Sequence, residues 1–96
     1  GVTEGTFREL IGEVPTRSAP AAQFADPGFP VIELFVHAGL SPSKGQCRKD
    51  LEGGGLYLNN VKLTDMQQRV TVRDVLFGRH LLLRKGKRNY TVVNLE

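Results

Sequence analysis

Basic side chains are the groups in this sequence whose types and spacing best suit a chemical task, and that task is binding an anion. Thirteen of the 96 residues are Lys or Arg and ten are Asp or Glu, so the formal net charge is +3. Residues 1–43 hold two basic and five acidic residues, whereas residues 44–96 hold eleven and five. The resulting charges of −3 and +6 make the second half the candidate for a polyanionic partner, although a solvated basic surface without a ligand would have the same composition.

Two groups of cations stand out within the second half. Lys44 and Arg48 are four residues apart, followed by Lys49. On a helix the first two lie side by side and repel each other slightly, which an anionic partner would offset. The second group falls between residues 79 and 88, a stretch without acidic residues. Its members are Arg79, Arg84, Lys85, Lys87 and Arg88.

Residue types that usually serve catalysis or metal binding are scattered. His37 and His80 have no second metal ligand at a suitable spacing, so we expect structural or exposed roles for them. Cys47 is the single cysteine and lies on an inner helix stripe, which favours a small core residue over a nucleophile. The glycines at 53–55 lack the Lys-Ser/Thr of a phosphate loop. We therefore expect no catalysis, metal or cofactor within these residues.

The length is that of one domain with a modest core, too short for the nucleotide-binding fold of a self-sufficient enzyme. The longest apolar runs, Val31–Ile32 and Leu81–Leu83, are far shorter than a membrane span. We expect no membrane association.

The elements that must position the cations begin with an N-terminal helix. The spacing predicts a helix from Thr3, its cap, to Val14, with Pro15 ending it. Its apolar face comprises Phe7, Leu10, Ile11 and Val14. Residues 15–30 contain four of the five prolines and predict an extended linker without a core of its own. We thus expect residues 1–14 to form a helix separate from the rest, and residues 31–96 to form the main domain.

Two further helices are predicted before the strands begin. One covers residues 31–38, between Pro30 and a glycine. The other follows Ser43, which forms a capping-box pattern with Gln46, and ends at the glycines after Glu52.

Beyond residue 55 the hydrophobic period changes to two. Residues 56–59 and 61–64 predict a hairpin around Asn59-Asn60, and residues 80–84 and 89–93 predict a second one with a basic tip. A strand near 69–72 and a helical turn at 74–77 are expected between them. The fold class is therefore α+β: two packed helices on a small, mostly antiparallel sheet, preceded by a helix and a linker.

The segment from Leu40 to Asn60 resembles an RNA-binding module named after small-subunit ribosomal protein four. The family pattern is a Ser-Lys start, an Ala-Arg-Arg run, two glycines and a strand ending in Asn-Gly. Here Cys47 replaces the Ala, Lys49 the second Arg and Asn60 the last Gly. The resemblance implies that fold, and RNA as the partner.

The segment from Gly78 to Tyr90 looks like the end of bacterial-type tyrosyl-tRNA synthetases, where Gly-Arg, an apolar triplet and Arg-Lys-Gly-Lys-x-Asn-Tyr recur. Residues 29–40 are similar to the lead-in of the same family, and the helix at residues 1–14 loosely resembles the end of the helical region that precedes it. The resemblance implies a C-terminal domain that binds the variable arm and anticodon-stem side of tyrosine tRNA. The residues it assigns to RNA binding are Ser43, Lys44, Gln46, Arg48, Lys49, Asn59, Asn60, Lys62, Arg79, Arg84, Lys85, Lys87 and Arg88.

By the same resemblance, this fragment alone is not an enzyme but part of an ATP-dependent tyrosine–tRNA ligase whose catalytic domain precedes residue 1. ATP and Mg²⁺ are expected only for the full-length enzyme, which would be a homodimer, whereas the fragment would be a monomer. The compartment would be the bacterial cytoplasm or the mitochondrial matrix. A ribosome- or rRNA-binding module, or a structural or interaction domain of the same fold, remains the alternative. Tyr57 and Tyr90 could stack on an unpaired base or be ordinary sheet residues.

Overall fold

The computed structural model describes residues 3–12 and 14–96, and the side chains of Arg8, Leu10 and Ile11 lie outside the described part. Its helices are α1 (Glu4–Ile11), α2 (Val31–His37) and α3 (Lys44–Glu52), with 3₁₀ turns at Ala21–Phe24 and Val72–Asp74. Its strands are β1 (Thr16–Ala19), β2 (Phe29–Pro30), β3 (Leu56–Leu58), β4 (Val61–Lys62), β5 (Arg69–Val70), β6 (His80–Lys85) and β7 (Asn89–Leu95).

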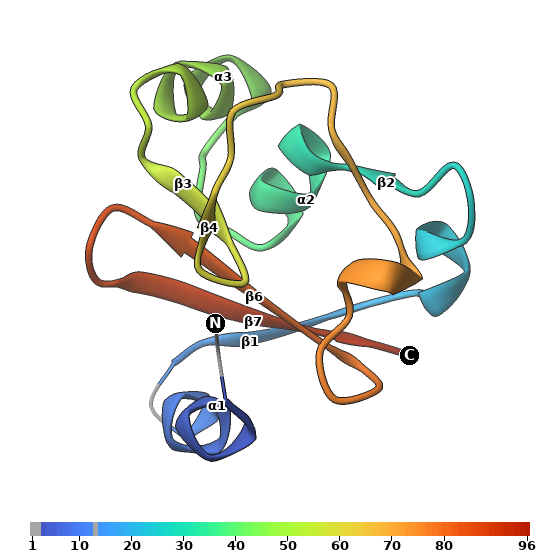
Figure 1. The fold of residues 1–96 in the computed structure, drawn as a ribbon. Coiled ribbons are helices and arrows are strands. Elements are labelled where there is room, and N and C mark those ends of the chain that lie inside the picture. The colour runs from blue at the N-terminus through green and yellow to red at the C-terminus, as the bar shows by residue number, and fades with distance from the viewer. Residues whose placement is uncertain (1–2, 13) are drawn as a thin grey trace.

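A five-stranded sheet with the order β1-β7-β6-β3-β4 forms the centre of the domain. Strand β1 is parallel to β7, and the other neighbours are antiparallel. Strands β2 and β5 form a separate antiparallel pair. Helices α2 and α3 lie above the sheet and α1 below it (Figure 1). The predicted α+β class, with two packed helices on a mostly antiparallel sheet, is confirmed.

Alternation along β6 divides the apolar side chains between the two faces of the sheet. Leu81 and Leu83 join the large core under α2 and α3. Leu82 faces the opposite side, where it packs with Val92 and with Phe7 of α1. The sheet is therefore buried on both faces, with the larger cluster on the side of α2 and α3.

Residues 15–30 differ from the predicted linker without a core. Strand β1 pairs with β7, and both Ala19 and Phe24 are buried. The prolines at 15 and 20 flank four residues that keep their N–H groups, so the segment between them can join a sheet although proline cannot donate. The packing prediction was wrong, whereas the division of the chain at residues 14 and 30 stays a prediction.

The segment after β5 also differs from expectation. Instead of a helical turn at 74–77, the turn covers Val72–Asp74, because Thr71 and Asp74 form a reciprocal capping box. The chain then reverses at Phe77 and Gly78, which have φ values of 51° and 86°. The expected strand near 69–72 is limited to β5, which pairs with β2 outside the central sheet.

Candidate nucleic-acid interface

Helix α3 presents cations to solvent because its apolar stripe is directed inward. Cys47 and Leu51 are buried, whereas Lys44, Arg48 and Lys49 are exposed. The helix begins at the predicted cap, where the Gln46 backbone N–H donates to Ser43 Oγ over 3.1 Å. Lys44 Nζ lies 3.1 Å from a carboxylate oxygen of Glu33 on α2. Arg48 and Lys49 thus form the exposed cationic part of the helix.

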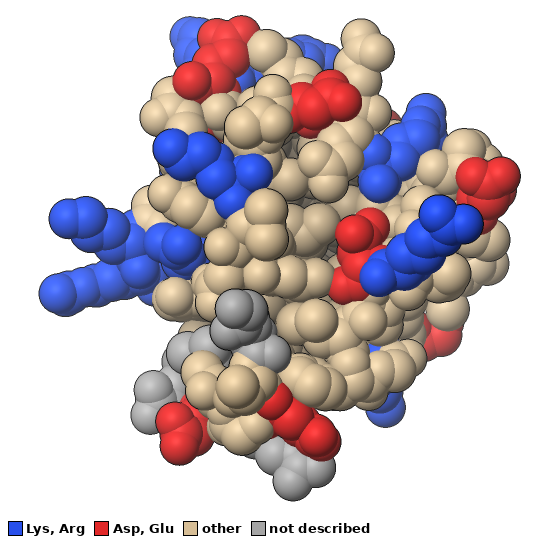
Figure 2. Space-filling model, viewed as in Figure 1, with Lys and Arg blue, Asp and Glu red and all other residues tan. Residues whose placement is uncertain are grey.

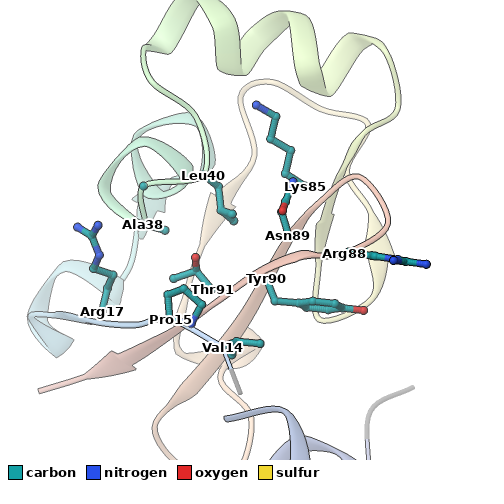
Figure 3. Close-up of a pocket in the computed structure, with 11 residues that line it drawn as sticks. Val14, Pro15, Arg17, Ala38, Leu40, Lys85, Arg88, Asn89, Tyr90 and Thr91 are labelled. Carbon is teal, nitrogen blue, oxygen red and sulfur yellow. The ribbon is translucent and has the colours of Figure 1, made fainter. Parts of the chain in front are cut away.

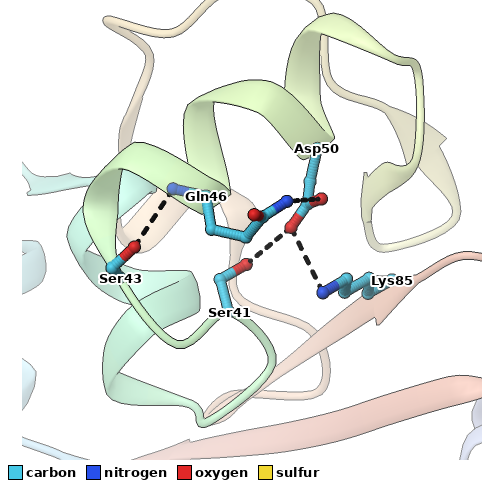
Figure 4. Close-up of polar contacts among 5 residues, drawn as sticks. All are labelled: Ser41, Ser43, Gln46, Asp50 and Lys85. Atoms are coloured by element: carbon cyan, nitrogen blue, oxygen red, sulfur yellow. Dashed lines mark hydrogen bonds and ion pairs between the residues drawn. The ribbon is translucent and has the colours of Figure 1, made fainter.

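Asp50 connects α3 to the β6–β7 hairpin (Figure 4). Its carboxylate accepts hydrogen bonds from Gln46 Nε2 at 2.9 Å and Ser41 Oγ at 3.3 Å, and lies 3.2 Å from Lys85 Nζ. Burial alone would raise the pKa of Asp50, but the bonds from Gln46 and Lys85 and the Lys85 charge lower it below its usual value. Two predicted RNA contacts, Gln46 and Lys85, are therefore engaged within the domain.

The β3–β4 turn has the positive φ values expected of Asn-Asn, 51° at Asn59 and 65° at Asn60. The Asn59 amide donates to the backbone carbonyl of Asp74 and accepts from the Leu82 N–H, so its side chain serves the fold. Lys62 follows in β4, and its side chain lies over Gly54 in the turn after α3. A Cβ atom added to Gly54 would be only 3.1 Å from Lys62 Nζ. Asn60 and Lys62 are exposed beside these contacts.

The β6–β7 hairpin contains cations of two kinds. Lys87 and Arg88 are exposed at its tip, where Figure 2 shows basic side chains gathered at the left of the molecule. Arg84 is half-buried, with its guanidinium carbon 3.8 Å from the centre of the Tyr57 ring and 5.8 Å from that of Tyr90. The three residues are cross-strand neighbours. The Tyr57 ring thus contacts a guanidinium of its own domain.

Arg79 lies apart from the other predicted cations of the hairpin. It precedes β6, whose opposite end carries Lys85, and six strand residues span about 20 Å. The structure brings Lys87 and Arg88 together at the tip and leaves Arg79 at the far end of the strand.

A cavity of about 440 Å³ lies between β1, the end of α2 and β7 (Figure 3). Arg17, Lys85 and Arg88 line it, but their charged ends point in different directions, with Lys85 directed toward α3. Arg17 was not among the predicted site residues, because it falls in the segment interpreted as a linker. The charges around this cavity therefore do not converge on one ligand position.

A second, larger cleft of about 500 Å³ lies beside α3. Lys44 and Arg48 line it together with Glu33 and with Arg69 of β5. Arg69 was also not among the predicted site residues, because only the pairing of β5 with β2 brings it to this cleft.

Groups suited to catalysis have structural surroundings. His37 Nε2 lies 2.8 Å from the carbonyl oxygen of Ser18, and His80 Nδ1 lies 2.5 Å from the side-chain oxygen of Asn94. Burial raises the pKa of the Cys47 thiol, which disfavours the reactive thiolate. Within residues 3–12 and 14–96, no cluster of His, Cys, Asp and Glu could hold a metal ion. No helix in this part of the chain could span a membrane.

Known proteins share this arrangement of sequence. The family model described as the tyrosine–tRNA ligase SYY-like C-terminal domain matches residues 9–93. The chain belongs to this family. A tyrosine–tRNA ligase of Opitutus terrae is 52% identical over 95 residues, covering 99% of this chain and 22% of that protein.

More distant members agree over the same region. A tyrosine–tRNA ligase of Salmonella arizonae is 37% identical, covering 96% of this chain and 23% of that protein. One of Roseiflexus castenholzii is 34% identical, covering 91% and 20%. The chain thus spans about a fifth of the length of the curated relatives it matches. The range matched by the family model, residues 9–93, includes both the α3 cations and the hairpin tip.

Proposed function

We propose that this domain binds tRNA and docks tyrosine tRNA, on its variable arm and anticodon-stem side, for ligation by a catalytic domain outside this chain. The observation that carries the proposal is the exposed pair Arg48 and Lys49 on α3, in a chain that belongs to a tyrosine–tRNA ligase domain family. We further propose that residues 31–96 adopt the ribosomal-protein-four-like module. ATP and Mg²⁺ would act in the catalytic domain.

The mechanism is recognition of backbone shape and phosphate position. The deep groove of an A-form helix is closed to side chains, so cations on α3 and at the hairpin tip would contact phosphates rather than base edges. Arg48, Lys49, Lys87 and Arg88 are all exposed and suited to this role. Each phosphate contact releases counterions, so affinity would fall steeply with salt.

A salt-dependent titration of the 96-residue chain with tyrosine tRNA tests the proposal. Reversing the helix cations with Arg48→Glu and Lys49→Glu should abolish most binding, because two phosphate contacts become repulsive. The matched control, Arg48→Lys with Lys49→Arg, keeps both charges and should retain most affinity. Unfolding curves of both variants establish that the fold is intact.

Other functions predict other outcomes in the same titration. A ribosome-associated module would bind rRNA fragments more tightly than tyrosine tRNA. A purely structural domain would bind neither RNA. Unchanged affinity of a folded charge-reversal variant would overturn the assignment of the helix cations.

A further inference from the structure

The cleft of about 500 Å³ between α2, α3 and β5 is lined by apolar as well as charged side chains. A surface that only bound RNA phosphates would not need the apolar ones. Its volume falls within the roughly 300–1,000 Å³ typical of small-ligand sites. Apolar atoms come from Pro30, Ile32 and Met66, of which Ile32 is 6% exposed and the others half-buried. The cleft therefore offers apolar surface as well as charge.

Polar side chains surround this apolar surface. Lys44 and Arg48 come from α3, Arg69 and Gln67 from the β5 side, and Glu33 from α2. Three cations and one carboxylate give a net charge of +2, which attracts an anion. Glu33 Oε1 lies 3.1 Å from Lys44 Nζ, and the carboxylate can accept further hydrogen bonds. Glu33 is the informative member, because a carboxylate repels phosphate but accepts hydrogen bonds from base amino groups.

Hydrogen bonds to backbone carbonyls join the segments that line the cleft. The Val31 N–H donates to the Gln68 carbonyl over 2.9 Å, which joins the start of α2 to the turn before β5. Arg69 Nη1 donates to the Gly28 carbonyl over 3.1 Å and leaves other N–H donors of the guanidinium for a ligand. The chain between β4 and β5 passes beside α2 and α3 (Figure 1).

We infer that this cleft binds one unpaired nucleotide of the RNA. Arg48 and Arg69 contact its phosphate, the apolar surface packs on the base, and Glu33 and Gln67 bond to the base edge. Every base has an apolar face, whereas only an unpaired one can leave the helix and enter a cleft. The role within tRNA rests on the proposed function, but binding of a nucleotide by the cleft does not.

A nuclear magnetic resonance titration of the 96-residue chain with adenosine 5′-monophosphate, ribose 5-phosphate and inorganic phosphate tests the inference. The mononucleotide should shift the resonances of Ile32, Gln67 and Arg69 and bind several-fold more tightly than ribose 5-phosphate, because only it carries the base. Arg69→Ala should weaken mononucleotide binding several-fold. Arg73→Ala removes an exposed arginine outside the cleft and should leave it unchanged.

Three results would overturn the inference: equal affinity for the mononucleotide and ribose 5-phosphate, resonance shifts confined to another surface, or unchanged mononucleotide binding by folded Arg69→Ala. If Arg69→Ala unfolds, Glu33→Gln keeps the size of the side chain and should lower the ratio of mononucleotide affinity to inorganic phosphate affinity, because it removes both a hydrogen-bond acceptor for the base and a charge that repels phosphate. An unchanged ratio would likewise overturn the inference. Loss of tRNA binding in the α3 charge-reversal variant, together with failure of mononucleotide binding, would retain the proposed function and remove only the cleft. Mononucleotide binding by a chain that does not bind tRNA would retain the cleft and remove the proposed function.

Discussion

On α3, Arg48 and Lys49 extend from an exposed helix face, whereas on β6 Arg84 and Lys85 are half-buried and have partners inside the domain. All four carry the same charge and stand in pairs of adjacent cations in the sequence. Their roles differ because sheet register places Tyr57 beside Arg84, and tertiary packing places Asp50 beside Lys85. A basic cluster in a sequence can therefore combine residues that are exposed to solvent with residues that hold the fold together.

The largest expected effect on stability belongs to Arg84→Ala. This change removes the contact of the guanidinium with Tyr57 and its hydrogen bond to the Gly86 carbonyl. The free energy of unfolding should fall by about 1–2 kcal/mol, as for a partly buried cation–π contact with a hydrogen bond. Urea unfolding measures this, with Arg88→Ala as the exposed control. An equal loss of stability in the two variants would contradict the distinction between half-buried cations with partners inside the domain and exposed cations.

A smaller effect is expected from the contact between Asp50 and Lys85. A double-mutant cycle with Asp50→Asn and Lys85→Met should give a coupling energy of about 1 kcal/mol, because both side chains are partly shielded from water. The cycle is measured by urea unfolding. Coupling indistinguishable from zero would show that the two groups do not stabilise each other.

The same contact should contribute to acid sensitivity. The folded-state pKa of Asp50 is lowered, so the unfolded chain binds the proton more readily and stability rises with pH. The contribution should be complete above pH about 4, near the ordinary aspartate pKa, and disappear as the pH falls through the lower folded-state value. Thermal unfolding between pH 2 and 7 should show a shallower acid dependence for Asp50→Asn. An unaltered profile would assign the acid sensitivity to other carboxylates.

Stability should change least when the hairpin tip is altered. Lys87→Ala with Arg88→Ala removes two exposed cations and should leave the unfolding midpoint unchanged. Affinity for tyrosine tRNA should nevertheless fall several-fold and depend less steeply on salt. Calorimetry and a binding titration measure the two quantities. A destabilised variant would show that Lys87 and Arg88 stabilise the fold, as Arg84 does, instead of being free for a partner.

Local signals predicted the elements that carry the candidate site. The Ser43 cap, the Asn59-Asn60 turn and the β6–β7 hairpin all follow from residues close in sequence, and all occur in the structure. The burial of Cys47 followed from helical periodicity in the same way. The exposed cations of α3 were predictable because a helix with a narrow apolar stripe has a defined outer face.

Features that depend on distant residues were not predictable. Strand β1 looked like a linker because its four residues show no strong apolar alternation, and only β7 supplies the hydrogen bonds that make it a strand. The contact between Asp50 and Lys85 joins α3 to β6, which are separated in the sequence by β3, β4, β5 and a 3₁₀ turn. The cleft with Arg69 needed the β2–β5 pair. A strand near residues 69–72 was expected, but β2 has two residues, too few to recognise from a pattern, so the pairing was not.

The parallel pairing of β1 with β7 also bears on how the domain is made. Ser18 at this edge donates to Glu96, 78 residues further along the chain, so the contact closes a very long loop. Long-range pairings of this kind slow folding, because the entropy of the loop is lost before the contact forms. During synthesis, β1 leaves the ribosome before β7 and has no partner in the sheet until β7 follows. Ala19 and Phe24 can therefore be buried as in the folded domain only after β7 has emerged.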